Sequence, residues 1–330
     1  MMTTGLVRTA GALVALAIIS ACGGGSAVAP SSIALSGRPL TAARTNTSPL
    51  PRFATIVSDL RAKPDVLYPT REYIINTYGS YASIFDYPKS DKQVGMINNV
   101  GGQGCTNVLY GYGKEIIWIV AGPNQITEYK VPQRPIKTLS VPYSFPTSCA
   151  MNASGDLAVG IYGTSGGGDV VIFKNANGTG TAYPTPLHQE FFDGYDPAGN
   201  LFADGFTGDR SGFALVELPN GSSKFQKIKT SNRVQFPGSV QWDGKYLVVT
   251  DQLANAMYQY TVSGTTATLQ GTVSLNGSSD CAQTWIGKGV VICGDAGGSG
   301  EIYKYPAGGS PVVVLTGNFD TPLGTTAANK

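Results

Sequence analysis

The chain has 330 residues, including 43 glycines and 20 prolines, with 10% aromatic residues and a formal net charge of +2. Charged residues make up 13% of it, about half of the roughly 25% found in soluble domains, and turn formers with aromatic residues favour many short strands. The small net charge and the absence of a Lys/Arg cluster exclude nucleic acid as an expected partner.

Residues 1–21 have the pattern of an export signal. A basic residue precedes an apolar stretch, residues 10–19, that is too short to cross a bilayer. The stretch ends in ISAC at residues 19–22, which resembles the lipobox of bacterial lipoproteins. The resemblance implies cleavage before Cys22 and lipid on its sulfur, which would anchor the protein to a membrane without a spanning helix. The alternative is an ordinary signal peptide whose removal leaves a free thiol at Cys22.

Residues 22–50 are expected to be the lipidated cysteine and a disordered linker. Gly, Ala, Ser, Thr and Pro dominate this segment, and it has few large apolar groups to offset the entropy of ordering the chain. The lipoprotein interpretation places the protein in the bacterial cell envelope, on the extracytoplasmic side, at the outer membrane or the cell surface. Residues 51–330 then form a single domain.

A repeated strand-like unit fills this domain. Apolar segments follow five glycines that are separated by 42, 44, 45 and 45 residues: Gly113, Gly155, Gly199, Gly244 and Gly289. Residues 71–76 fit one step earlier. A regular period in this range is typical of a solenoid or a propeller.

Each unit contains four expected strands. A short strand precedes the glycine, an apolar strand follows it, and a third strand alternates aromatic with other residues, as in residues 256–260. A short fourth strand, such as residues 312–315, completes a unit typical of a propeller blade. Residues 320–326 resemble the inner-strand segment 236–240, and the first unit lacks a good inner strand of its own. We therefore predict an all-β, six-bladed β-propeller with four strands per blade, closed by the C-terminal strand pairing into the first blade.

Residues 196–204, with the sequence DPAGNLFAD, carry the clearest copy of a repeat motif. Together with the units around it, over about residues 70–328, this motif resembles NHL-type repeats and the six-bladed senescence-marker protein and gluconolactonase-like families. The resemblance implies the propeller architecture. It also implies a possible divalent-cation site, because the gluconolactonase-like families hold such a cation at the channel mouth with Glu, Asn and Asp residues. The N-terminal segment that supplies the Glu in those families is missing here.

Two aspartates are the candidate ligand or cation contacts. Asp193 and Asp280 are expected at the starts of inner strands, where they would face the channel mouth and share a cation such as Ca²⁺ through oxygen ligands. The alternative is that they cap strand ends and accept hydrogen bonds from backbone amides in turns. No other cofactor is expected.

Four cysteines remain after Cys22, and an even number in an exported protein suggests disulfides. Cys105 and Cys149 occupy corresponding places one blade apart, while Cys281 and Cys293 flank a turn and so lie across one hairpin. We predict the pairs Cys105–Cys149 and Cys281–Cys293. The alternative is four buried free thiols.

The sequence offers little for catalysis. His188 is the single histidine, which excludes HExxH zinc sites and sites built from several histidines. No catalytic residue is predicted, and we favour a membrane-anchored binding module for a protein, a glycan or a small ligand. The alternative is a divalent-cation-dependent hydrolase or lactonase of the gluconolactonase-like type.

Overall fold

A computed structural model describes residues 71–76, 79–109, 113–121, 123–142, 145–163, 167–208, 212–287 and 289–329. The expectations for residues 1–50, including Cys22, lie outside these ranges. Within the described ranges there is no apolar helix of membrane-spanning length.

The described chain is all-β apart from one short 3-10 helix, η1 (Lys174–Ala176). The strands of the first half are β1 (Arg71–Asn76), β2 (Tyr81–Phe85), β3 (Gln93–Asn98), β4 (Gly104–Thr106), β5 (Gly113–Lys114), β6 (Ile116–Val120), β7 (Gln125–Lys130), β8 (Arg134–Ser140), β9 (Pro146–Met151), β10 (Leu157–Ile161), β11 (Asp169–Phe173) and β12 (Thr181–Pro184). The strands of the second half are β13 (Gln189–Tyr195), β14 (Leu201–Phe206), β15 (Phe213–Leu218), β16 (Gln226–Thr230), β17 (Pro237–Trp242), β18 (Leu247–Asp251), β19 (Ala256–Ser263), β20 (Thr266–Ser274), β21 (Cys281–Gly287), β22 (Val290–Asp295), β23 (Ser299–Lys304), β24 (Val313–Leu315) and β25 (Pro322–Asn329).

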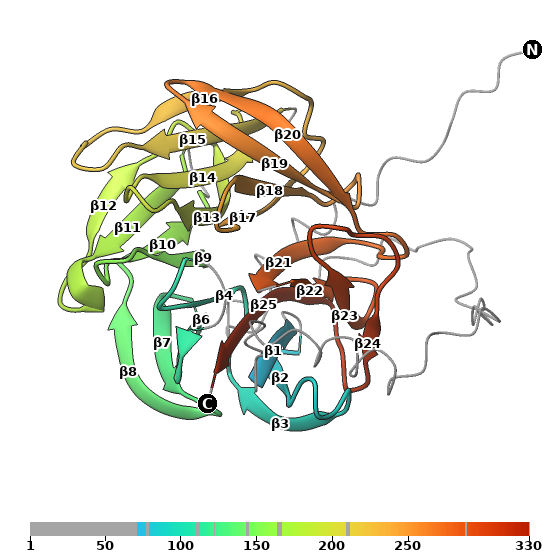
Figure 1. Cartoon of the computed structure of the whole chain (residues 1–330). Coiled ribbons are helices and arrows are strands. Elements are labelled where there is room, and N and C mark those ends of the chain that lie inside the picture. The colour runs from blue at the N-terminus through green and yellow to red at the C-terminus, as the bar shows by residue number, and fades with distance from the viewer. Residues whose placement is uncertain are drawn as a thin grey trace, which may run out of the picture.

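The strands are arranged around a common centre, as in a β-propeller (Figure 1). Three sheets have four strands each: β4-β6-β7-β8, β9 to β12, and β21 to β24. A five-stranded sheet has the order β3-β2-β1-β25-β5, and an eight-stranded sheet runs from β13 to β16 and then from β20 back to β17. The expectation of six separate four-stranded sheets is therefore met only in part. The reason is that the outer strands β16 and β20 pair in parallel over two residues and join two antiparallel units into one sheet.

The C-terminal strand closes the arrangement, as the sequence predicted. β25 pairs antiparallel with β1, from Arg71 opposite Ala328 to Asn76 opposite Pro322. Figure 1 shows the last strand of the chain beside the first one. Because both ends of the described chain are committed to one sheet, neither β1 nor β25 is left as a free edge.

Four of the five periodic glycines lie in the turns that their spacing predicted, whereas Gly113 lies in the short strand β5 and Glu115 has the positive φ value there. Gly155, Gly199, Gly244 and Gly289 all have positive φ values, between 78° and 100°. Each of them lies in the turn that precedes the second strand of a unit, at β10, β14, β18 and β22. A residue with a Cβ is disfavoured in this left-handed conformation, so glycine marks each turn.

The core consists of six clusters of buried side chains. Five of them join two neighbouring units, and the largest joins the β13–β16 and β17–β20 units and also includes Tyr162, Ala282 and Leu323. Successive residues of a strand belong to different clusters. Val159 of β10 packs towards β6, for example, whereas its neighbour Ala158 packs towards β14 and β15. This alternation follows from the two-residue period of a strand, and it buries both faces of every central sheet.

Around the central axis, the innermost strands contact one another in a closed circle: β4, β9, β13, β17, β21, β25 and back to β4. Hydrogen bonds between residues 45 positions apart, Ser239 to Thr284 and Gln241 to Ile286, show that neighbouring inner strands lie in the same register. All the inner strands therefore end at one face of the molecule and begin at the other. This geometry defines the two mouths of the central channel.

Candidate functional site

Glutamine side chains link the inner strands around the channel. Gln283 of β21 donates to the carbonyl of Gly104 at 2.8 Å and accepts from the amide of Thr325 at 2.7 Å, so it connects β21 to both β4 and β25. Gln241 of β17 accepts from the amide of Ile286 at 2.8 Å. These buried side-chain amides form hydrogen bonds with the backbone of neighbouring inner strands, and this makes the channel wall rigid.

An acidic cluster lies where β13 and β14 pack against β9. It consists of Glu190 and Asp193 of β13 and Asp204 of β14, all three of which are buried. No side chain donates to either carboxylate oxygen of Asp204 or to the Oδ1 atom of Asp193. The backbone amides of Phe192 and Gly238 approach Asp204, and that of Gly160 approaches Asp193. Buried charges are normally paired, so three neighbouring buried carboxyl groups with no basic side chain bonded to them in the described part of the chain are an unusual arrangement.

Burial dominates the acidity of the cluster. It raises the pKa of Asp193 to about 7, with the Ser148 hydroxyl and the Gly160 amide acting in the opposite direction. Burial and the neighbouring charges of Asp193 and Asp204 raise the pKa of Glu190 well above its usual range. The pKa of Asp204 is also raised, first by burial. The cluster therefore holds protons at a pH where an exposed carboxyl group is ionised.

One serine shows why all the carboxyls cannot be ionised together. The Ser148 hydroxyl lies 2.9 Å from Oδ2 of Asp193 and 3.2 Å from Oε1 of Glu190. A hydroxyl carries one hydrogen and can donate it to only one of these oxygens. The other oxygen must bring its own proton, or a cation must offset the repulsion between the two groups.

Asp193 also lines a cavity in the central channel. The cavity has a volume of about 30 Å³, and its wall includes Ser239, Gln241, Thr284 and Trp285. Among the described residues, no Lys, Arg or His lines it. A space of this size holds a water molecule or a group of similar size.

Two larger hollows flank this cavity at the face where the inner strands end. One has a volume of about 200 Å³ and shares Tyr195 with the central cavity. The other has a volume of about 180 Å³ and shares Trp242 with it. Tyr195 and Trp242 are the last residues of β13 and β17, so the central cavity shares one aromatic residue at the end of an inner strand with each of the larger hollows.

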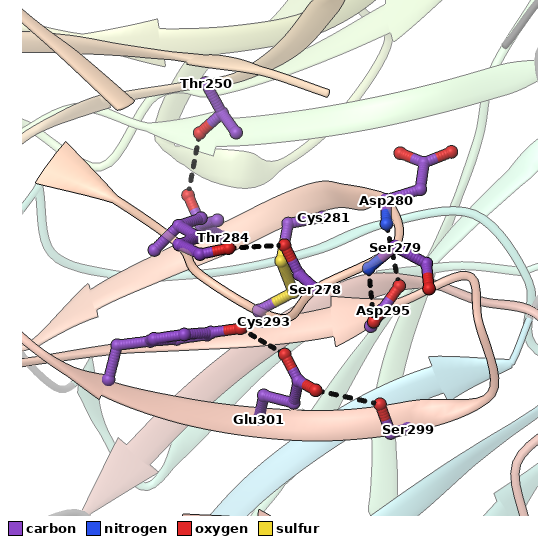
Figure 2. Close-up of a disulfide and its surroundings, with 12 residues drawn as sticks. Thr250, Ser278, Ser279, Asp280, Cys281, Thr284, Cys293, Asp295, Ser299 and Glu301 are labelled. Atoms are coloured by element: carbon purple, nitrogen blue, oxygen red, sulfur yellow. Dashed lines mark hydrogen bonds between the residues drawn. A yellow bond between two sulfur atoms is a disulfide. The ribbon is translucent and has the colours of Figure 1, made fainter. Parts of the chain in front are cut away.

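Asp280 lies elsewhere. It immediately precedes β21, at the face where the inner strands begin, and its amide donates to Oδ1 of Asp295 at 2.8 Å. Its own carboxylate turns away from Asp295 (Figure 2), and its Oδ1 atom has no partner. Burial, followed by the charge of Asp295, raises the pKa of Asp280 to about 7.

The expectation that Asp193 and Asp280 share one channel mouth is therefore wrong. Asp193 is the fifth residue of β13, deep in the wall, because β13 begins at Gln189, earlier than the sequence suggested. Backbone capping, the alternative considered for this pair, is instead the role of Asp251 and Asp295. Asp251 accepts from the amides of Gln235 and Phe236, and Asp295 accepts from those of residues 279, 280 and 297.

Both predicted disulfides are confirmed. Cys105 and Cys149 join β4 to β9, neighbouring inner strands, with a Cα–Cα distance of 5.7 Å. Cys281 and Cys293 join β21 to β22 across one hairpin, with a Cα–Cα distance of 5.6 Å (Figure 2). Among the described residues, this second pair and Glu301 are the only three His, Cys, Asp or Glu side chains whose possible ligand atoms all lie within 4.8 Å of one another. Because both sulfurs are bonded to each other, that group is not a metal site.

Sequence reasoning missed Glu190, Tyr195 and Trp242 as residues of the site. The signal for Glu190 was available, since a glutamate beside two phenylalanines in a fully buried strand is rare. Tyr195 and Trp242 carry no local signal that separates them from the many other aromatic residues of the repeats.

Neither a protein-family model nor a curated protein sequence matches the chain. Among solved structures, a functionally unknown protein from Desulfotomaculum acetoxidans DSM 771 is similar, with a TM-score of 0.53 at 7% identity. The similarity covers 79% of this chain and 99% of that one. A chain of the mitotic checkpoint complex gives a TM-score of 0.46 at 12% identity over 65% of each chain, which is too low to support an argument. The similarity to the first structure concerns the fold alone.

Proposed function

We propose that this chain is a six-bladed β-propeller that acts as a binding module, held at an extracytoplasmic membrane surface by lipid on Cys22. The number six is supported by the closed circle of six inner strands and by the six core clusters. It counts the eight-stranded sheet as two blades, divided at the short parallel pairing of β16 with β20. The anchor is supported by the lipobox-like sequence at residues 19–22.

The binding surface is the face where the inner strands end. The observation that carries this proposal is the presence of three hollows at this face, two of which share Tyr195 or Trp242 with the central one. Loops and strand ends from several units converge there on a frame that the glutamine links make rigid. The two outer hollows, about 200 and 180 Å³, are each smaller than a typical pocket for a drug-sized molecule. They suit an elongated ligand that lies across the face.

The hydrolase alternative has no specific observation in its favour. A bound Ca²⁺ takes six to eight oxygen ligands at roughly 2.3–2.6 Å. Asp193 and Asp280, the pair considered for that role, lie at different depths of different units. The binding module is therefore the function that the geometry supports best.

A binding screen tests this proposal. The soluble chain from residue 23 would be applied to glycan and peptide arrays, and each hit would be measured by tryptophan fluorescence. Trp242→Ala should weaken binding at least tenfold, because Trp242 lines two of the hollows. Leu253→Ala is the control, since Leu253 is 53% exposed and belongs to none of the three hollows. Equal binding by the two variants would contradict the proposed face.

A further inference from the structure

We infer that two of the three Asn–Gly pairs in the described chain, Asn177–Gly178 and Asn276–Gly277, are sites of spontaneous deamidation, and that the fold protects the third pair, Asn220–Gly221. Deamidation is a covalent modification that needs only water as a co-reactant. All three asparagines are exposed, so the difference between them comes from how each side chain is held. These sites are independent of the proposed binding function.

The reaction joins the asparagine side chain to the main chain. The amide nitrogen of the glycine attacks Cγ of the asparagine, loses its proton and closes a five-membered succinimide ring. The bond from Cγ to Nδ2 breaks, and ammonia leaves with that proton. Water then opens the ring at either carbonyl group and gives aspartate or isoaspartate. Glycine favours the reaction because it has no side chain that shields its amide nitrogen.

The three glycines have similar surroundings. The φ values of Gly178, Gly221 and Gly277 are 71°, 80° and 96°, and a Cβ atom on any of them would meet no atom beyond its chain neighbours within 4 Å. Serine follows Gly221 and Gly277, and threonine follows Gly178. Neither the glycines nor the residues after them therefore account for a difference in rate.

Asn220 is fixed by hydrogen bonds on its side chain and its backbone. Its Nδ2 atom donates to the carbonyl of Ala198 at 2.8 Å, and its backbone amide donates to Oδ1 of Asn200 at 2.9 Å. The amide of Ser222 donates to the carbonyl of Pro219 at 2.8 Å and closes the turn between them. Ring closure needs the side chain and the backbone to turn towards each other, and these bonds oppose that movement. Because Asn220 lines the larger outer hollow, the protected pair is the one at the proposed binding face.

The carboxamide groups of Asn177 and Asn276 are not held in this way. Among the described residues, neither side chain donates or accepts a hydrogen bond. Only their backbone amides are bound, that of Asn177 to the carbonyl of Lys174 at 3.1 Å and that of Asn276 to the carbonyl of Gly309 at 2.9 Å. The side chains can therefore turn towards the next amide nitrogen without breaking a side-chain hydrogen bond.

Conversion of Asn276 would act on the start of β21. The Ser278 hydroxyl donates to the carbonyl of Leu275 at 2.9 Å, across the reacting pair. The two backbone amides that follow Ser278 each donate to Asp295 at 2.8 Å (Figure 2). Isoaspartate adds a methylene group to the main chain at the beginning of this segment, so these bonds should weaken and the midpoint of thermal unfolding should fall.

Peptide mapping by mass spectrometry tests the inference. The purified protein would be kept at 37 °C and pH 8.5, and the mass gain of about one dalton would be followed at each pair. In the folded protein, Asn177 and Asn276 should convert at least fivefold faster than Asn220. In protein unfolded in guanidinium chloride, the three should convert at similar rates, because the residues after them are alike and the protecting hydrogen bonds are gone.

Variants assign the products. Asn177→Gln and Asn276→Gln should each remove one acidic form from the ion-exchange profile of the aged protein, because glutamine would need a six-membered ring, which closes more slowly. Asn220→Gln is the matched control and should leave the profile unchanged. Equal conversion of Asn220 and Asn276 in the folded protein would overturn the inference. Protection of all three pairs in the folded protein, with conversion only after unfolding, would also overturn it.

Discussion

Replacing Asp193 with asparagine should stabilise the protein at high pH and leave it nearly unchanged at low pH. The carboxyl group has a usual pKa of 3.8, and burial raises this to about 7 in the folded chain. The native state therefore keeps the proton that the unfolded chain loses first. As pH rises from about 4 to about 7, the free energy of unfolding should fall, and above pH 7 this contribution should stay constant.

The magnitude follows from the two pKa values. They differ by about 3, and each unit corresponds to 1.36 kcal/mol, so the ionised Asp193 lowers the free energy of unfolding by up to roughly 4 kcal/mol at pH 8. Glu190 titrates with it, so this figure is an upper bound for the single residue. Asparagine removes the charge and still exchanges a hydrogen bond with Ser148. At about 2 °C per kcal/mol for a domain of this size, the midpoint of unfolding should rise by up to roughly 8 °C.

The assay is urea and thermal unfolding of the wild type and Asp193→Asn at one-unit steps from pH 4 to pH 8. Glu115→Gln serves as the control, because Glu115 is an exposed carboxylate paired with Lys130 at 3.1 Å and should contribute less than about 1 kcal/mol at any pH. Equal effects of Asp193→Asn at pH 4 and pH 8, or a loss of stability that grows with pH, would refute the reasoning.

Three other predictions concern the frame and the anchor. Serine at both Cys105 and Cys149 should lower the free energy of unfolding by roughly 4 kcal/mol, from the entropy of closing a 44-residue loop, and urea titration with and without reductant measures this. Truncation after Gly317 removes β25 and exposes β1, so the whole ring should lose its cooperative unfolding transition, whereas a melt with only a small early loss would show that the end merely frays. Cys22→Ser should release an unlipidated form from membranes, and fractionation that still finds normal maturation and full membrane association would contradict the lipobox interpretation.

The parts of the fold that the sequence predicted are those with a local signature. The glycines at 155, 199, 244 and 289 mark turns that need a left-handed residue, and the strand after each one is where their spacing placed it. The Cys105–Cys149 disulfide followed from the same period, because these residues fall at equivalent places in adjacent units, and Cys281–Cys293 followed from the hairpin turn between them. A local geometry that recurs along the chain can therefore be predicted from a single sequence.

The candidate site was predicted less well because it depends on contacts between units. Asp193 meets Ser148 from 45 residues earlier and Glu190 from its own strand, and only the packing of β9 against β13 brings these groups together. The pairing of β16 with β20 also has no local signal, so it could not be predicted from the sequence. The placement of Asp193 and Asp280 at one mouth failed for the same kind of reason. A strand start that shifts by a few residues moves a side chain from the rim of the channel into its wall.

The stability test and the binding test together decide what Asp193 is for. A carboxyl group that lowers the free energy of unfolding by several kcal/mol does not hold the frame together, and in this structure the glutamine links and the disulfide between β4 and β9 do that. If asparagine at this position makes the protein more stable but weakens the binding of a ligand found in the array screen, the carboxylate stabilises that ligand at the expense of the fold, as functional groups often do. If asparagine stabilises the protein and binding is unchanged, Asp193 affects only the stability of the fold, through its buried proton, and takes no part in binding. In that case the ligand lies wholly in the outer hollows around Tyr195 and Trp242.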